Sequence, residues 1–216
     1  MIRGIIFDMD GTIIDTNPYI YELWNDFVFK KTGQKISKID LGQQLGKSGD
    51  DFVSYFIKKF GIDMEISDIW DHIHKTYEAP HLVSGLKKGA KKVLNEFSNK
   101  YKIALATGAL RSFALTALNE YKIINYFDYI ISGSDIKKGK PAPEMFLNAA
   151  KGLGLKPSEC VVIEDARLGL LAANAAGMKC IMVEDEFTKY QDHSLADFKI
   201  ESLEVLPNLI YELNKI

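Results

Sequence analysis

The fold is decided by residues 5–12, which read Ile5-Ile6-Phe7-Asp8-Met9-Asp10-Gly11-Thr12. An apolar run ends in two carboxylates one residue apart, and a glycine follows at once. This pattern predicts a buried strand that stops abruptly at a turn. We therefore expect Asp8 and Asp10 to lie at the C-terminal end of that strand.

The two aspartates have two possible interpretations. Asp-x-Asp-Gly is common in surface turns and calcium loops, so Asp8 and Asp10 could simply cap the following helix. The apolar run in front favours a functional site, because surface turns seldom follow buried strands and open α/β sheets bind ligands at the carboxyl ends of their strands. Mg²⁺ suits such an edge, since it takes carboxylate oxygens and leaves positions for water and phosphate. One aspartate could then attack phosphorus while the other handles a proton.

The composition indicates an ordinary globular protein whose partners are small molecules. The chain has 216 residues, of which 47% are hydrophobic and 26% charged, and its net charge is -2 without long runs of one sign. We expect no nucleic-acid partner and no membrane partner. Cys160 and Cys180 lie in apolar runs and are expected to be buried thiols, which suits a reducing cytoplasm. We see no targeting segment, and the protein could be a monomer or a dimer.

Helices dominate the first third of the chain after the opening strand. Apolar residues recur at helical spacing over residues 17–32, 50–60 and 65–77, and no convincing strand occurs between residues 16 and 80. From about Leu82 the pattern changes. A helix is predicted from Gly85-Leu86, and helices over residues 112–121, 143–153 and 168–176 alternate with strands at 102–106, 129–131, 160–163 and 179–183. A weak strand near Phe198 and a helix from about Leu203 close the chain.

This alternation predicts an α/β fold, a doubly wound parallel sheet with helices on both faces. The opening strand cannot stand alone and should join that sheet. Residues 1–15 and 82–216 are then the α/β core, and residues 16–81 are an inserted helical cap domain near the functional edge.

Three other strand ends carry complementary groups. Thr107, Gly108 and Ala109 follow one strand and could bind phosphate through a hydroxyl and backbone N–H groups, although a plain helix cap is the alternative. Lys140 stands between Gly139 and Pro141, so its loop is restrained. A surface lysine is usually solvated, but a restrained one can neutralise a transferring phosphoryl group.

The last of these strand ends is acidic. Glu164 and Asp165 form a second carboxylate pair directly after an apolar run. One such pair could be accidental, whereas two pairs accompanied by a threonine and a lysine indicate a binding site. In that site the acids would surround a cation, and the cation and Lys140 would surround a phosphate.

These four motifs, in this order, resemble the haloacid dehalogenase (HAD) superfamily. The resemblance spans residues 5 to about 183 and is nearest to the branch of phosphoglycolate phosphatase and β-phosphoglucomutase, which has a helical cap and a Rossmann-like core. It implies a Mg²⁺-dependent phosphatase that acts on phosphoglycolate or a sugar phosphate through an aspartyl-phosphate intermediate. Dehalogenation is not expected, because Asp10 is present where dehalogenases lack an acid.

The resemblance also implies a role for each motif residue. Asp8 would be the nucleophile and Asp10 the general acid and base, and the backbone carbonyl of Asp10 would join the metal. Thr107, Gly108 and Ala109 would bind phosphate. Lys140 would steady the phosphoryl charge, Asp165 would complete the Mg²⁺ site, and Glu164 would bind the ion directly or through water. Gly11 and Thr12 would shape the loop after the nucleophile.

Two alternatives to hydrolysis remain at this point. A β-phosphoglucomutase-like phosphosugar mutase would carry a histidine where this chain has Ile20, and an arginine in the loop that here reads Gly46-Lys47-Ser48-Gly49-Asp50. Lys47 and Ser48 are the best candidates for substrate contact from the cap, although an ordinary turn explains them equally well. A phospho-accepting signalling switch also combines acids, a threonine and a lysine, but the inserted helices have no purpose in it.

Overall fold

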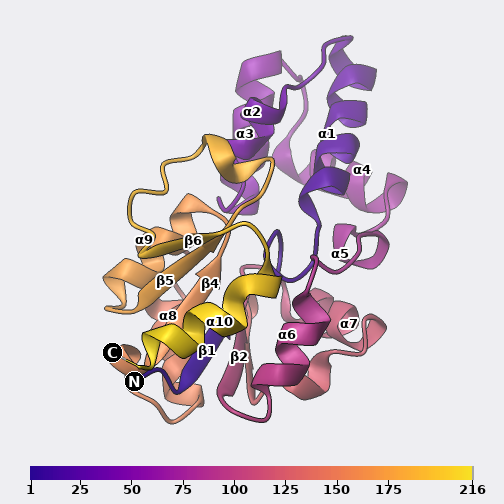
Figure 1. Cartoon of the computed structure of the whole chain (residues 1–216). Coiled ribbons are helices and arrows are strands. Elements are labelled where there is room, and N and C mark those ends of the chain that lie inside the picture. Colours follow the sequence, from indigo (N-terminus) through magenta and orange to yellow (C-terminus); the bar gives the residue numbers. More distant parts are fainter. Residues whose placement is uncertain (216) are drawn as a thin grey trace.

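The central sheet is parallel throughout. A computed structural model describes residues 1–215, excepting the side chain of His81, so the last residue of the predicted core, Ile216, lies outside the described residues. The strands are β1 (Gly4–Phe7), β2 (Lys102–Ala106), β3 (Tyr129–Ile131), β4 (Cys160–Glu164), β5 (Lys179–Val183) and β6 (Phe198–Ile200). Their order is β3-β2-β1-β4-β5-β6 (Figure 1). Each neighbouring pair is parallel, which confirms the predicted doubly wound sheet.

Strand β1 lies between β2 and β4 and is buried along its whole length. Because successive side chains of a strand point to opposite faces, Ile5 and Phe7 join the apolar cluster on one face, and Ile6 joins that on the other. Three helices cover the first face: α6 (Ala90–Phe97), α7 (Arg111–Glu120) and α10 (Leu206–Leu213). The second face is covered by α8 (Glu144–Gly152) and α9 (Arg167–Ala175). The continuous apolar run of β1 is therefore explained by burial on both faces.

The inserted segment consists of helices with an apolar cluster of their own. The helices are α1 (Asn17–Thr32), α2 (Lys38–Gly42), α3 (Gly49–Phe60), α4 (Ile66–Thr76) and α5 (Pro80–Val83). Trp24 stacks on Phe56 at 5.3 Å between ring centroids, and Phe187, from the chain after β5, joins the same cluster. The helices lie over the carboxyl ends of the strands (Figure 1). Helices α2 and α5 are not predicted from the sequence, since one helical turn is too short to show periodicity.

Two chain segments connect these helices to the sheet, and they pair with each other. Ile14 and Leu86 form an antiparallel bridge. The N–H of Lys87 donates to the carbonyl of Ile13 at 2.8 Å, and that of Asp15 donates to Gly85 at 2.8 Å. We call residues 13–15 and 85–87 the neck. The prediction that a helix starts at Gly85-Leu86 is wrong, because this stretch pairs with the outgoing chain and α6 begins only at Ala90.

The last helix also begins later than predicted. Residues Leu203–Val205 form a single 3₁₀ turn, and α10 starts at Leu206 with a proline in its first turn. Proline fits that place because its missing N–H has no partner in the first turn of a helix. Among residues 1–215, no helix combines the length and the apolar character needed to cross a bilayer.

Candidate active site

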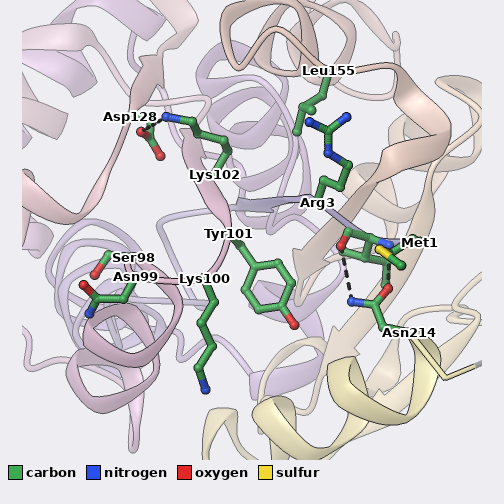
Figure 2. Close-up of a pocket in the computed structure, with 11 residues that line it drawn as sticks. Met1, Arg3, Ser98, Asn99, Lys100, Tyr101, Lys102, Asp128, Leu155 and Asn214 are labelled. Carbon is green, nitrogen blue, oxygen red and sulfur yellow. Dashed lines mark hydrogen bonds and ion pairs between the residues drawn. The ribbon is translucent and has the colours of Figure 1, made fainter.

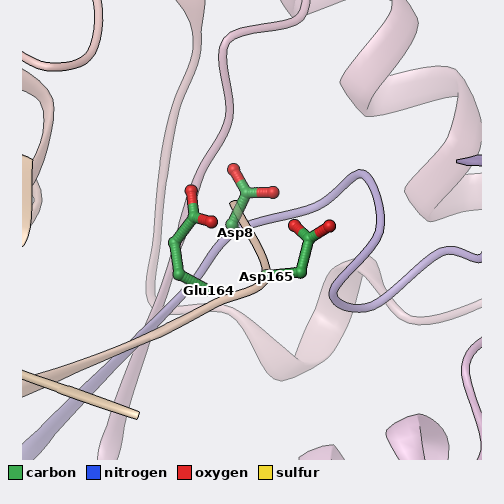
Figure 3. Close-up of side chains that lie close together, drawn as sticks. All are labelled: Asp8, Glu164 and Asp165. Carbon is green, nitrogen blue, oxygen red and sulfur yellow. The ribbon is translucent and has the colours of Figure 1, made fainter. Parts of the chain in front are cut away.

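Three carboxylates from two neighbouring strands lie together at the carboxyl edge of the sheet. Asp8 follows β1 directly, Glu164 is the last residue of β4, and Asp165 comes next. Because Phe7 pairs with Ile163 in parallel register, the chain brings Asp8 beside Glu164. One oxygen from each carboxylate lies within 4.8 Å of the others (Figure 3). We call these three residues the acidic cluster.

Lys140 joins the acidic cluster from the loop that precedes α8. Its Nζ lies 2.5 Å from Oδ1 of Asp8 and 2.6 Å from Oε1 of Glu164. The lysine side chain is only 9% exposed, so it is not the solvated surface lysine of the alternative interpretation. The ion pair joins residues 132 positions apart in the chain.

The loop that carries Lys140 is held by its own contacts. The carboxylate of Glu144, in the first turn of α8, accepts the backbone N–H groups of Lys137 and Lys138 at 2.9 Å each. The Lys140–Pro141 peptide bond is cis. The side chains of Lys137 and Lys138 are exposed, whereas Lys140 points inward to the acids.

Burial and mutual repulsion perturb the acids of the cluster. Burial raises the pKa of Asp8 to about 8, with Glu164 adding to the shift and Lys140 opposing it. Burial likewise raises the pKa of Asp165 well above its ordinary value, and its carboxylate neighbours add to this. Burial by itself would lower the pKa of Lys140, but Asp8 and Glu164 outweigh it and the pKa is raised. One lysine cannot balance three buried carboxylates, and such an all-oxygen donor set fits a hard divalent cation such as Mg²⁺.

Asp165 is held in place by residues that follow β1. The hydroxyl of Thr12 donates to its Oδ1 at 3.3 Å, and the amide of Asn17 donates to its Oδ2 at 3.2 Å. Gly11 has a φ of 77°, and a Cβ at this position would lie 2.2 Å from Oδ2 of Asp165. The position therefore requires glycine for both its backbone conformation and the close approach of the carboxylate. Asn17 was missed in the sequence, because an asparagine at the start of a helix carries no signal beyond that of an ordinary helix end.

Asp10 lies two residues after Asp8 and forms an isolated bridge with Ile14. The loop is closed by a hydrogen bond from the N–H of Gly11 to the carbonyl of Ile14, at 2.8 Å. Burial raises the pKa of Asp10, while the hydroxyl of Thr16 and the charge of Lys140 act in the opposite direction. A raised pKa favours the protonated form of the carboxyl group, which is the form that an acid catalyst needs.

Thr107 follows β2, on the other side of β1 from the acidic pair of β4. It is buried, and its N–H donates to the carbonyl of Ile131 at 3.1 Å. The N–H of Ala109 donates to the hydroxyl oxygen of Thr107 at 3.1 Å. Among the hydrogen bonds of the described residues, none uses the N–H of Gly108.

The structure does not join the two predicted cap residues to the acidic cluster. Ser48 caps α3, and its hydroxyl donates to Oδ2 of Asp51 at 2.7 Å. The ammonium group of Lys47 donates to Oε1 of Gln44 at 2.7 Å. Both Lys47 and Gln44 line a cavity of about 460 Å³ beside α3. Among the described residues, no hydrogen bond or ion pair connects Lys47 or Ser48 with Asp8, Glu164 or Asp165.

A second hollow of the surface, about 510 Å³, lies at the opposite end of the sheet. It is lined by residues that precede or begin β1 and β2, among them Arg3 and Lys102, and by Asp128 and Asn214 (Figure 2). Its three basic side chains are already paired: Arg3 with Glu159 at 2.7 Å, Lys102 with Asp128 at 2.8 Å and Lys100 with Glu96 at 3.0 Å. This hollow is remote from the carboxyl edge and belongs to no part of the candidate active site.

Comparison with known proteins identifies the family of the chain. The family model of the haloacid dehalogenase-like hydrolases matches residues 5–183. The chain is 30% identical to the fructose-1-phosphate phosphatase YqaB of Escherichia coli, over 83% of this chain and 95% of that protein. It is 31% identical to a phosphorylated carbohydrates phosphatase of Thermotoga maritima, over 83% and 84% of the two chains.

A solved structure is similar over the whole chain. The crystal structure of β-phosphoglucomutase from Clostridium difficile superposes with a TM-score of 0.81 at 27% identity, and the match covers 100% of this chain and 98% of that one. The family match covers both acidic pairs, the threonine loop and the lysine loop. The chain is therefore an enzyme that belongs to the haloacid dehalogenase-like hydrolase family.

Proposed function

We propose that the protein is a Mg²⁺-dependent phosphatase of small phosphorylated metabolites. The observation that carries the proposal is the contact of buried Lys140 with both Asp8 and Glu164, beside Asp165. A carboxylate held between a fixed cation and a site for a second cation is suited to meet an anionic phosphoryl group, which it would otherwise repel.

The metal would be held by residues at the ends of β1 and β4. Side-chain oxygens of Asp8 and Asp165 and the backbone carbonyl of Asp10 are the proposed ligands. The bound ion would neutralise charge on the phosphoryl oxygens. Glu164 is proposed to act beside the ion, because one of its oxygens accepts from Lys140 and the other from the N–H of Ala166 at 2.6 Å.

Covalent transfer would proceed in two steps. A carboxylate oxygen of Asp8 forms a bond to phosphorus while the bond from phosphorus to the ester oxygen breaks, and Asp10 gives its proton to the departing alkoxide. Asp10 then takes a proton from water, whose oxygen attacks the phosphorus of the aspartyl-phosphate. Inorganic phosphate leaves, and the carboxylate of Asp8 is restored.

The remaining phosphate contacts would come from the loop after β2. The hydroxyl of Thr107 and the N–H of Gly108 would donate to phosphoryl oxygens. The N–H of Ala109 would do so by leaving its present acceptor, the hydroxyl of Thr107. Lys140 would balance the charge that develops on the transferring group.

We further propose that residues 16–81 act as a cap domain on a core of residues 1–15 and 82–216. Helices over the carboxyl edge can exclude bulk water while the phosphoryl group is transferred. In this proposal Lys47 and Ser48 remain the predicted substrate contacts from the cap, and the enzyme works in the cytoplasm.

A phosphorylated sugar, or a small acid such as phosphoglycolate, is the proposed substrate class. Two relatives carry names of sugar-phosphate phosphatases, and the structural neighbour with a TM-score of 0.81 is a phosphosugar mutase. Ile20 and the loop without arginine favour hydrolysis over the mutase reaction. Membership in a hydrolase family disfavours the signalling switch.

A panel of phosphorylated metabolites, assayed for phosphate release with and without Mg²⁺, tests the proposal. We expect Mg²⁺-dependent release that falls by roughly 1,000-fold or more in Asp8→Asn, since the nucleophile is lost. Asp63→Asn, on the exposed surface of the helical segment, is the matched control. Activity that survives Asp8→Asn would contradict the nucleophile, and stimulation by a bisphosphorylated sugar would favour the mutase.

A further inference from the structure

The side-chain amide of Gln191 bridges two loops that come from different parts of the chain. Its Nε2 donates to the carbonyl of Gly42 at 2.6 Å and to that of Leu45 at 3.1 Å. Its Oε1 accepts the backbone N–H of Arg167 at 2.5 Å. A glutamine amide offers two donors and one acceptor group, and here the nitrogen faces two carbonyls while the oxygen faces an N–H.

The two bridged loops also touch each other directly. We call residues 42–48 the cap loop and residues 164–167 the acidic loop. A Cβ at Gly46 of the cap loop would lie 3.2 Å from the Cβ of Ala166 in the acidic loop. A Cβ at Gly42 would lie 2.0 Å from the carbonyl oxygen of Phe187, so the segment that carries Gln191 also presses against the cap loop. The hydrogen bonds of Gln191 therefore add to an interface in which the cap loop already packs against the acidic loop and against Phe187.

The segment that carries Gln191 has further contacts within itself and with the helical segment. The N–H of Gln191 donates to the carbonyl of Thr188 at 2.9 Å. Phe187 is 3% exposed and packs into the apolar cluster of the helical segment. Glu186 forms an ion pair with Lys38 of α2 at 2.5 Å.

The acidic loop connects Gln191 to Lys140 through a series of hydrogen bonds. The N–H of Arg167 goes to Gln191, and the neighbouring N–H of Ala166 goes to Oε2 of Glu164 at 2.6 Å. Oε1 of Glu164 then meets Lys140, which contacts Asp8. A displacement of the acidic loop would therefore also displace Glu164, and through its hydrogen bond would change the position of Lys140.

We propose that Gln191 is a positioning residue that sets the cap loop against the acidic loop, and so fixes how far a substrate's leaving group reaches from the phosphoryl site into the cap. The proposal rests on the phosphatase function proposed above. A substrate whose leaving group is large enough to touch the cap loop should depend on Gln191, whereas a very small one should not.

Kinetics with two substrates of different size test this dependence. In Gln191→Leu we expect kcat/KM for hexose monophosphates to fall roughly tenfold, mainly through KM, because two hydrogen bonds to the cap loop are lost. For acetyl phosphate the change should stay below about twofold, because its leaving group is too small to reach the cap. Gln34→Glu, on an exposed side chain of the helical segment, is the control for substitution of a glutamine.

Backbone hydrogen exchange provides a readout that does not depend on activity. Gln191→Leu should speed exchange both in residues 42–48 and at the N–H of Arg167. In Gln191→Glu the carboxylate still accepts from Arg167 but faces the two carbonyls, so exchange should rise in the cap loop and stay slow at Arg167. This contrast separates loss of the bridge from general loosening of the fold.

The outcomes distinguish this proposal from the one on which it rests. A wild-type protein that hydrolyses no phosphate ester overturns the proposed function. A wild-type phosphatase whose two Gln191 variants behave like Gln34→Glu in both measurements overturns only the role of Gln191. An equal loss of activity on hexose phosphates and on acetyl phosphate also overturns it, because that is the result of a merely structural role.

Discussion

The ammonium group of Lys140 lies 2.5 Å from Oδ1 of Asp8, and both side chains are only 9% exposed. Two loops supply the pair, one after β1 and one before α8. A buried carboxylate destabilises the folded state unless it is paired with a cation, and Lys140 provides that cation for Asp8. The same contact therefore contributes both to the stability of the fold and to the proposed reaction.

Lys140→Met should remove activity and destabilise the protein together. We expect phosphate release to fall by roughly 100-fold or more, because the charge beside the transferring group is lost. The free energy of unfolding should fall by about 3–5 kcal/mol, since Asp8 and Glu164 are left buried without their cation. Steady-state kinetics and urea titration measure the two effects. Lys138→Met, at an exposed neighbour in the same loop, should change neither, and a Lys140 variant with more than about a tenth of wild-type activity would rule out this role.

Binding of Mg²⁺ should be visible without any substrate. A ligand that binds only the folded state raises the melting temperature, so Mg²⁺ should stabilise the wild-type protein against heat. Asp165→Asn removes one charged ligand while an oxygen remains to accept from Thr12 or Asn17, and this variant should lose most of the shift. Differential scanning calorimetry with and without Mg²⁺ checks this, and chelation with EDTA should abolish phosphate release.

The matched control for the metal prediction is Asp63→Asn, at an exposed aspartate of the helical segment. It should show the full stabilisation by Mg²⁺. If Asp165→Asn shows the same shift as this control, the ion does not bind at the acidic cluster.

Lys87 of the neck should be important for stability. Its Nζ lies 2.5 Å from Oδ2 of Asp185 and 3.1 Å from Oδ1 of Asp15, so it joins both neck segments to the end of β5. The side chain of Asp185 is 3% exposed, and Lys87→Met would leave it buried and unpaired. We expect the free energy of unfolding to fall by about 3 kcal/mol, measured by urea titration.

The adjacent Lys88 offers the control for Lys87. Its side chain is 78% exposed and pairs with Glu204, so Lys88→Met should have little effect. A double-mutant cycle with Asp185→Asn should recover part of the loss, because the unpaired charge is then removed. Strictly additive effects of Lys87→Met and Asp185→Asn would argue against the ion pair.

His193 should make the protein less stable as the pH falls. Burial lowers its pKa from 6.5, with Lys199 adding to the shift and Asp192, Glu164 and Glu184 opposing it. Since the pKa of the folded state lies below that of the unfolded chain, the unfolded state binds the proton more readily. The stability that neutral His193 contributes is therefore complete above about pH 6.5 and is lost as the pH falls through 6.5 toward the folded-state pKa.

Melting temperatures of wild type and His193→Asn between pH 7.5 and about pH 5 measure this contribution. The acids with raised pKa values, Asp8 among them, have the opposite pH dependence, but they are common to both proteins and cancel in the difference. The difference in melting temperature should narrow as the pH falls. His74→Asn, at an exposed histidine, is the control for the substitution of a histidine by asparagine. A constant difference for His193→Asn would show that its protonation is not linked to unfolding.

The sequence determined the order of the main elements and which strand ends carry polar groups. A buried parallel strand is an unbroken apolar run, so its end is visible wherever charged residues interrupt the run, as at Asp8 and at Glu164. Helical periodicity likewise located the long helices, because their apolar faces repeat over several turns. It failed at Gly85-Leu86, where the apolar residue pairs with Ile14 across the neck instead of facing a helix interface.

Only the tertiary structure decided which side chains meet. The register of β1 with β4 places Asp8 beside Glu164, and the packing of α8 brings Lys140 to both, but no local pattern encodes a contact 132 residues apart. The same holds for Asn17, Lys87 and Gln191, which look like ordinary polar residues in the sequence. Their partners come from distant segments, and the burial that strengthens these contacts exists only when the helical segment, the neck and the sheet are packed together.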